Sequence, residues 1–115
     1  MGILTKREQQ QPAFLDGTPW GVPQNIKAIG PGIWQIETGS HGGFYVNHGM
    51  NAQVPEAWRN ASFNGQGVAG WYEEDCDWAM VALAFPQHFT AEQLLHAVRT
   101  FQRVLVKMAK PEARS

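Results

Sequence analysis

The uninterrupted apolar run from Trp78 to Phe85 constrains the fold of this chain more than any other stretch. A helix that is apolar on every side has to be buried, and Pro86 stops it because proline lacks a backbone amide and clashes with the preceding turn. Four carboxylates precede the run, in a group that we call the acidic mouth: Glu73, Glu74, Asp75 and Asp77. Acidic side chains favour the positive end of a helix dipole. We therefore predict a buried central helix that has Asp75 as its N-cap.

A long amphipathic helix is predicted over residues 90–109. Thr90 and Gln93 fit a capping box, in which each side chain bonds the backbone amide of the other residue. Five apolar residues recur at heptad-like spacing as one stripe: Leu94, Val98, Phe101, Leu105 and Met108. Basic residues form a second stripe on a different face: Arg99, Arg103, Lys107 and Lys110.

The glycines separate the chain into two kinds of structure. All of them lie at or before Gly70, which places turns and short strands in the first 70 residues and helices after them. The stretch 33–38 is rich in strand formers, and 44–47 is expected to pair with it as a hairpin through the loop 39–43. A third strand is predicted over 68–72. Strands followed by helices indicate an α+β fold, with a small antiparallel sheet packed on the buried central helix and the long C-terminal amphipathic helix.

Local signals organise the remaining segments. Residues 18–21 read as a tight turn, and 55–60 as one or two helical turns with proline at the first position. Asn64-Gly65 suits a turn that needs a positive φ. Residues 1–12 are polar and glutamine-rich, so we expect a flexible arm there and a single globular domain over 13–115.

Composition excludes several classes of function. A formal net charge of −1 over 115 residues argues against binding to nucleic acid. No apolar run approaches the length of a membrane span, and the first residues lack the apolar segment of a secretory signal. Cys76 is the only cysteine, so an intrachain disulfide is impossible and a reducing, cytoplasmic location is expected. The glycine loop 39–43 lacks the lysine and the spacing of a phosphate loop, and we expect no cofactor.

Cys76 and His41 form a candidate catalytic pair. A cysteine on the first turn of a helix is activated by the helix dipole, and a histidine in the glycine loop could act as its base. This alternative would make the protein a small hydrolase or transferase. The four neighbouring carboxylates favour the neutral thiol, however, so a cysteine that only packs the start of the helix is the simpler interpretation.

The acidic mouth is also a candidate metal or ligand site. Clustered carboxylate oxygens bind hard cations, and a histidine such as His41 or His48 could complete a mixed set of ligands. The spacing matches no recognised metal motif, and acidic residues before a helix usually serve as dipole partners. We therefore assign no metal ligands, and a ligand- or metal-binding module stays an alternative.

Three motifs together resemble an uncharacterised domain family of bacterial, plasmid and phage proteins. They are SHGG at 40–43, SFNGQG at 62–67 and WYEEDCDW at 71–78. The resemblance spans roughly residues 18 to 90 and brings no established activity with it. It implies a mobile-element context, in which small stand-alone domains often inhibit or adapt host machinery.

These observations favour a small soluble protein that binds another protein. Its expected role is that of an accessory factor that counters host defence, comparable to an anti-CRISPR protein, and an enzyme is the less favoured reading. The acidic mouth would be the contact surface, with adjacent aromatic side chains, Trp71 and Tyr72, as anchors. Trp20, Trp58 and the basic stripe are further candidate contacts. The oligomeric state and the partner do not follow from the sequence.

Overall fold

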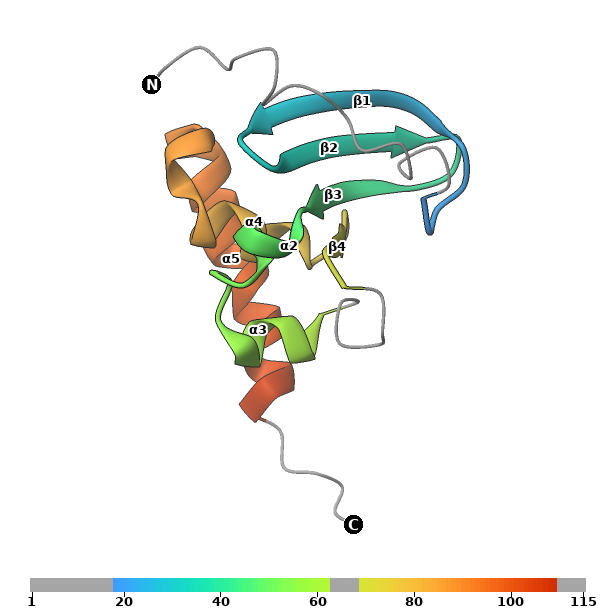
Figure 1. Cartoon of the computed structure of the whole chain (residues 1–115). Coiled ribbons are helices and arrows are strands. Elements are labelled where there is room, and N and C mark those ends of the chain that lie inside the picture. The colour runs from blue at the N-terminus through green and yellow to red at the C-terminus, as the bar shows by residue number, and fades with distance from the viewer. Residues whose placement is uncertain (1–17, 63–68, 110–115) are drawn as a thin grey trace.

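The computed structural model describes residues 18–62 and 69–109, and it has the predicted α+β fold (Figure 1). Four antiparallel strands form one sheet in chain order: β1 (Pro23–Gly30), β2 (Ile33–Thr38), β3 (Gly42–Val46) and β4 (Trp71–Glu73). Two short helices follow β3, α2 (His48–Asn51) and α3 (Glu56–Ala61). After β4 come α4 (Trp78–Ala84), a 3-10 turn (Pro86–His88) and α5 (Ala91–Ala109). In Figure 1 the helices gather on one side of the sheet, and α5 extends past it.

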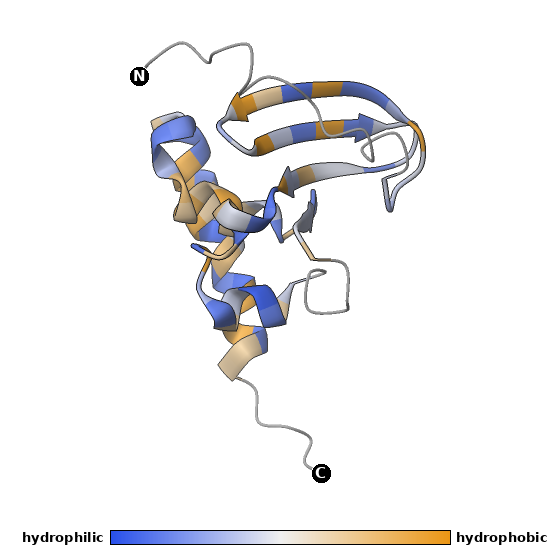
Figure 2. Cartoon of the chain, viewed as in Figure 1, coloured by the Kyte–Doolittle hydropathy of each residue, from blue (hydrophilic) through white to orange (hydrophobic). Residues whose placement is uncertain are grey.

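Both faces of the sheet carry apolar side chains, and apolar and polar bands along β1 and β2 are visible in Figure 2. Phe44 pairs with Gln35 on one side and Tyr72 on the other, and this row faces the helices. The neighbouring row, Trp34, Tyr45 and Trp71, points to the opposite face, because side chains alternate along a strand. There the three rings pack with Trp20 in a second aromatic cluster.

The predicted central helix is confirmed as the centre of the main core. In α4, Ala79, Met80, Val81 and Ala82 have no solvent exposure, and Phe85 is buried just after it. The prediction of Asp75 as the N-cap is wrong, because α4 begins at Trp78 with Asp77 at the N-cap position. Asp75 lies in the preceding turn, where the Glu73 carboxylate already accepts hydrogen bonds from the backbone amides.

The C-terminal helix begins where the capping box predicts. The Thr90 amide donates to Gln93 Oε1 at 2.8 Å, and the Gln93 amide donates to Thr90 Oγ1 at 3.1 Å. The heptad stripe, however, is only partly the buried face, because Phe101 is buried but Val98 and Leu105 are about half exposed. The buried residues of α5 are Ala97, Thr100, Phe101 and Val104. Small side chains at 97 and 100 allow close packing, and α4 is the main helical neighbour of α5.

The predicted strands are present with shifted ends. β2 has the predicted bounds, whereas β3 begins at Gly42, so the hairpin loop is 39–41 and shorter than expected. β4 begins at Trp71, three residues after the predicted start, and β1 was not predicted. The turn at 18–21 and the helical turns at 55–60 are confirmed, but Pro55 is the N-cap of α3 and not its first residue. The proposed arm, 1–12, and the Asn64-Gly65 turn lie outside the described residues. Across 18–62 and 69–109, no helix has the length and apolar character needed to cross a membrane.

Candidate functional site

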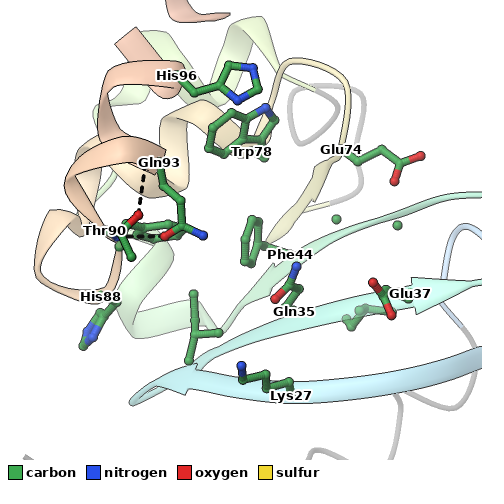
Figure 3. A pocket seen from close by; sticks show the side chains of 15 residues that line it. Lys27, Gln35, Glu37, Phe44, Glu74, Trp78, His88, Thr90, Gln93 and His96 are labelled. Atoms are coloured by element: carbon green, nitrogen blue, oxygen red, sulfur yellow. Dashed lines mark hydrogen bonds between the residues drawn. The ribbon is translucent and has the colours of Figure 1, made fainter.

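A groove of about 520 Å³ lies between the helix-facing side of the sheet and the beginning of α5. We call it the groove throughout. Figure 3 shows Trp78 and His96 above it, Lys27 and Gln35 below it, and Phe44 between them. Exposed polar side chains and partly buried rings therefore meet in one concave place, which is typical of a binding site.

The sheet wall of the groove consists of polar side chains from β1 and β2. Lys27 and Gln35 are cross-strand partners, and Glu37 follows two residues after Gln35 on the same face. All three are exposed although they point to the side of the sheet that carries the helices. The helices therefore cover the sheet only in part, and the uncovered part is the groove.

Aromatic rings form the floor and the helix wall. Phe44 of β3 meets Phe89 edge-on, with ring centroids 5.7 Å apart. Trp78, the first residue of α4, meets His96 of α5 in the same way at 5.2 Å. Such edge-to-face pairs hold both rings in defined positions. The groove therefore has a fixed aromatic surface beneath a polar rim.

His88 occupies the inner end of the groove. A Cβ atom at Gly30 would lie 2.5 Å from His88 Nε2, so only glycine at position 30 leaves room for the imidazole. His88 Nδ1 is buried and has no hydrogen-bond partner among residues 18–62 and 69–109. A buried polar atom without a partner is costly, and the His88 side chain also lines the groove.

Two carboxylates define the outer end of the groove, around Gly42. A Cβ atom on Gly42 would lie 3.3 Å from Glu74 Oε1 and 3.6 Å from the Cα of Glu37. It would also lie 2.7 Å from a backbone oxygen of β2, so a side chain cannot be placed there without moving the sheet. The Glu74 carboxylate also lies 3.7 Å from Nδ1 of His41, and both side chains are more than half exposed.

The acidic mouth does not form one surface. Only Glu74 and Asp75 are exposed, because Asp77 is buried and the Glu73 carboxylate is turned inward. Glu73 accepts hydrogen bonds from the amides of Asp75 (2.6 Å), Cys76 (2.9 Å) and Asp77 (3.2 Å). Its charge therefore stabilises the turn before α4 and is not offered to a partner.

The proposed aromatic anchors are buried as well. Trp71 belongs to the outer aromatic cluster, and Tyr72 has no solvent exposure. The Tyr72 hydroxyl donates a hydrogen bond to Asn51 Oδ1. Burial raises the pKa of Tyr72 well above its usual value of 10.0, with Arg59 opposing the shift and Asp77 adding to it. Tyr72 is thus a neutral core residue and is not accessible for contact.

The comparison with protein families decides what this chain is related to. A domain of unknown function, DUF7007, matches it over residues 15–113. The chain belongs to the DUF7007 family. No curated protein and no solved structure matches it. The expected membership of an uncharacterised domain family is therefore confirmed.

Cys76 and His41 have different neighbours in the DUF7007 domain. The Cys76 thiol is partly buried against the core, and Arg103 Nη1 of α5 lies 4.0 Å from its sulfur. His41 is exposed in the hairpin loop and faces Glu74. No hydrogen bond joins the two residues in the described part of the chain. Within that same part, no three His, Cys, Asp or Glu side chains come together as a metal site.

The two further tryptophans proposed as contacts are less exposed than expected. Trp58 packs on Phe101 with centroids 4.7 Å apart, and Trp20 packs edge-on against Trp71 at 5.5 Å. Both tryptophans are only partly exposed. The basic residues of α5, from Arg99 to Lys107, remain on its exposed side, and Lys110 lies outside the described ranges.

Most residues of the DUF7007 groove were missed by sequence reasoning. Gln35 and Glu37 occupy the polar positions of an alternating strand, which ordinarily indicates a face in water. Lys27 belongs to a strand that was not predicted. Among the groove residues, only Glu74 was named beforehand as a candidate contact residue, as part of the acidic mouth. The sequence does show polar residues on the same strand face as the buried Ile33. These residues indicate a site only because the helices leave that part of the sheet uncovered.

Proposed function

We propose that this domain binds another protein and that the groove receives a segment of that partner. The observation that carries the proposal is the meeting of an aromatic floor with exposed polar side chains of both charges in one concave site. Apolar rings supply the desolvated centre that interfaces need. The charged rim, with Lys27 on one side and Glu74 on the other, supplies orientation and selectivity.

The biological setting of this activity is part of the same proposal. We propose a small accessory factor of a plasmid or phage that acts in the cytoplasm and counters host defence. The resemblance of the three motifs to bacterial, plasmid and phage sequences supports the mobile-element context. The single cysteine suits a reducing compartment.

The first experiment blocks the groove. The chain is tagged, expressed in a native host and recovered with its bound proteins, which mass spectrometry identifies. Gln35→Trp places a large ring in the centre of the groove, at an exposed strand position that accepts aromatic residues. The matched control is Gln53→Trp, which is exposed and does not line the groove.

We expect the parent and Gln53→Trp to recover the same partner. The amount of that partner recovered with Gln35→Trp should be at least tenfold lower. The interaction is then repeated with the purified partner, so that specific recovery is separated from adhesion to the matrix. Equal recovery by Gln35→Trp and Gln53→Trp would contradict the groove as the contact site.

Charge reversal locates the contact more finely. Glu74→Lys changes a carboxylate of the groove without removing the turn contacts of Glu73, whereas Arg99→Glu/Arg103→Glu changes the basic side of α5. We expect the Glu74 variant to weaken binding to the purified partner, more strongly at low than at high salt. A loss confined to the arginine variant would move the contact from the groove to α5.

A further inference from the structure

We infer that the partner inserts an arginine side chain into the groove, with its guanidinium between Glu37 and Glu74. The inference rests on the proposed function and names the chemical group that the groove selects.

The outer end presents two exposed carboxylates, Glu37 and Glu74, that line the groove together with Gly42. Glu37 is the β2 partner of Gly42, and Glu74 comes from the turn after β4, with its Oε1 3.3 Å from where a Cβ on Gly42 would lie. In residues 18–62 and 69–109, neither carboxylate has a lysine or arginine partner. Glu37 accepts only a 3.5 Å contact from Asn25, and Glu74 faces His41. The outer end therefore has acceptor capacity and negative charge that the fold does not satisfy.

The form of this end favours a guanidinium over other cations. A guanidinium is flat and carries five N–H donors in a fixed fork, so it can bond two carboxylates from different elements at once. Its flat face also stacks on aromatic rings. Phe44 and Trp78 line the same groove and are held by their edge-on contacts with Phe89 and His96. A lysine ammonium would use the charge but would leave the planar surface unmatched.

A bare metal ion is a poorer match for the same place. Hard cations require several oxygen ligands at fixed short distances. In the described part of the chain, no group of three His, Cys, Asp or Glu side chains is suitably arranged to hold one. A cation attached to an organic side chain needs only two acceptors and gains the rest of its binding energy from the rings.

The β1 side of the groove gives the bound segment a direction. Lys27 contributes a positive charge there and repels a second cation. Gln35 and Gln93 lie between the two ends and carry amide groups that can bond a peptide backbone. An arginine at the outer end, followed by polypeptide toward Lys27, uses each of these groups.

The test compares two blocked amino acids that differ in charge and have nearly the same shape. Nα-acetyl-arginine amide and Nα-acetyl-citrulline amide are titrated into the ¹⁵N-labelled full chain, and amide shifts are followed by NMR. We expect saturable shifts at Gly42, Gly43 and Trp78 with the arginine probe, and at least fivefold weaker binding of citrulline. The corresponding lysine probe should also bind more weakly than arginine.

Two variants assign the preference to the groove. Glu74→Gln should reduce the arginine-to-citrulline ratio to near one, whereas Asp75→Asn, the matched change at the next exposed carboxylate, should leave it unchanged. Both positions are exposed, so both variants should fold. Equal binding of arginine and citrulline, equal binding of lysine, or equal loss in both variants would overturn the inference.

The outcome is separable from that of the proposed function. If Gln35→Trp loses the partner while arginine and citrulline bind alike, the groove binds protein and the arginine inference is wrong. If the probes differ as expected while Gln35→Trp keeps the partner, the groove selects a guanidinium but is not the protein-binding site, and the proposed function is wrong.

Discussion

Glu73 shows how a single carboxylate can hold the turn between a strand and a helix. Its two oxygens accept hydrogen bonds from three successive backbone amides in the turn before α4. Amides at the start of a helix have no acceptor within the helix itself. The sequence predicts acidic residues at this helix start, but four candidates stand within five positions. Which one turns inward depends on the path of β4, because Glu73 is the last residue of that strand.

Replacing Glu73 should therefore destabilise the fold more than replacing Asp75. We expect Glu73→Ala to cost about 1–2 kcal/mol, since three amides lose their acceptor, and Asp75→Ala to change stability by less than about 0.5 kcal/mol. Urea unfolding of both variants measures the difference. A larger loss of stability in Asp75→Ala than in Glu73→Ala would indicate that Asp75 is the capping residue.

Tyr72 makes a prediction about alkaline pH. Its pKa is raised in the folded state by burial, so the unfolded chain loses the phenolic proton near pH 10 while the folded chain keeps it. The unfolded state then binds fewer protons, and stability falls as pH rises above about 10. Tyr72→Phe should be less stable at neutral pH, because Asn51 loses its donor. It should also show a shallower decline between pH 10 and 12 than the parent, as measured by urea titrations at each pH.

Cys76 tests the enzymatic alternative. Its thiol is partly buried against the core and makes no hydrogen bond to His41 within the described residues. We expect slow labelling of the native protein by a maleimide and a rate within about twofold of the parent in His41→Ala, because exposure controls access. Labelling as fast as that of the unfolded chain, and strongly reduced in His41→Ala, would favour a catalytic pair.

Among the elements, α5 shows which part of a helix the sequence can predict. Its start is encoded locally by Thr90 and Gln93, and both bonds of the capping box are present. The buried face is not encoded locally, because Leu105 and Val106 are exposed while Ala97 and Thr100 are buried. The spacing of apolar residues predicts that the most hydrophobic face of α5 is buried. Close packing on α4 instead buries the face that carries small side chains. β1 escaped prediction for a related reason, since bulges near both of its ends obscure the alternation.

Two substitutions in α5 compare a buried member of the heptad stripe with an exposed one. Phe101→Ala should cost about 3–5 kcal/mol, because the ring is buried and packs on Trp58. Leu105→Gln should change stability by no more than about 0.5 kcal/mol, since that side chain is about half exposed. Chemical denaturation compares them. Similar large losses in both would indicate that the stripe is buried after all.

At the scale of the whole molecule, the centre was predictable and the site was not. Most of the apolar run from Trp78 to Phe85 has to be buried wherever it lies, so its position at the core follows from the run itself. The groove depends on how far the helices extend over the sheet. That quantity has no local sequence signal, and Lys27 and Glu37 read as ordinary exposed strand residues.

Phe85 tests the dependence of the whole domain on this core. It is 2% exposed and is among the largest fully buried side chains. We expect Phe85→Ala to cost about 3–5 kcal/mol through lost burial and a residual cavity. Domains of this size are commonly stable by only about 5–15 kcal/mol, so a clear fall in the melting temperature should result. An unchanged melting temperature would contradict a core centred on α4.

The order of the strands has a consequence for the folding pathway. β1, β2 and β3 follow one another through short turns, so their pairing involves only local contacts, which form fast. β4 joins β3 only after the intervening segment with α2 and α3 closes, and α5 docks from the end of the chain. The wall of the groove that carries Lys27, Gln35 and Glu37 therefore belongs to the part that can form first. Its opposite wall comes from α4 and α5, so the groove exists only once the sheet and the helices have docked.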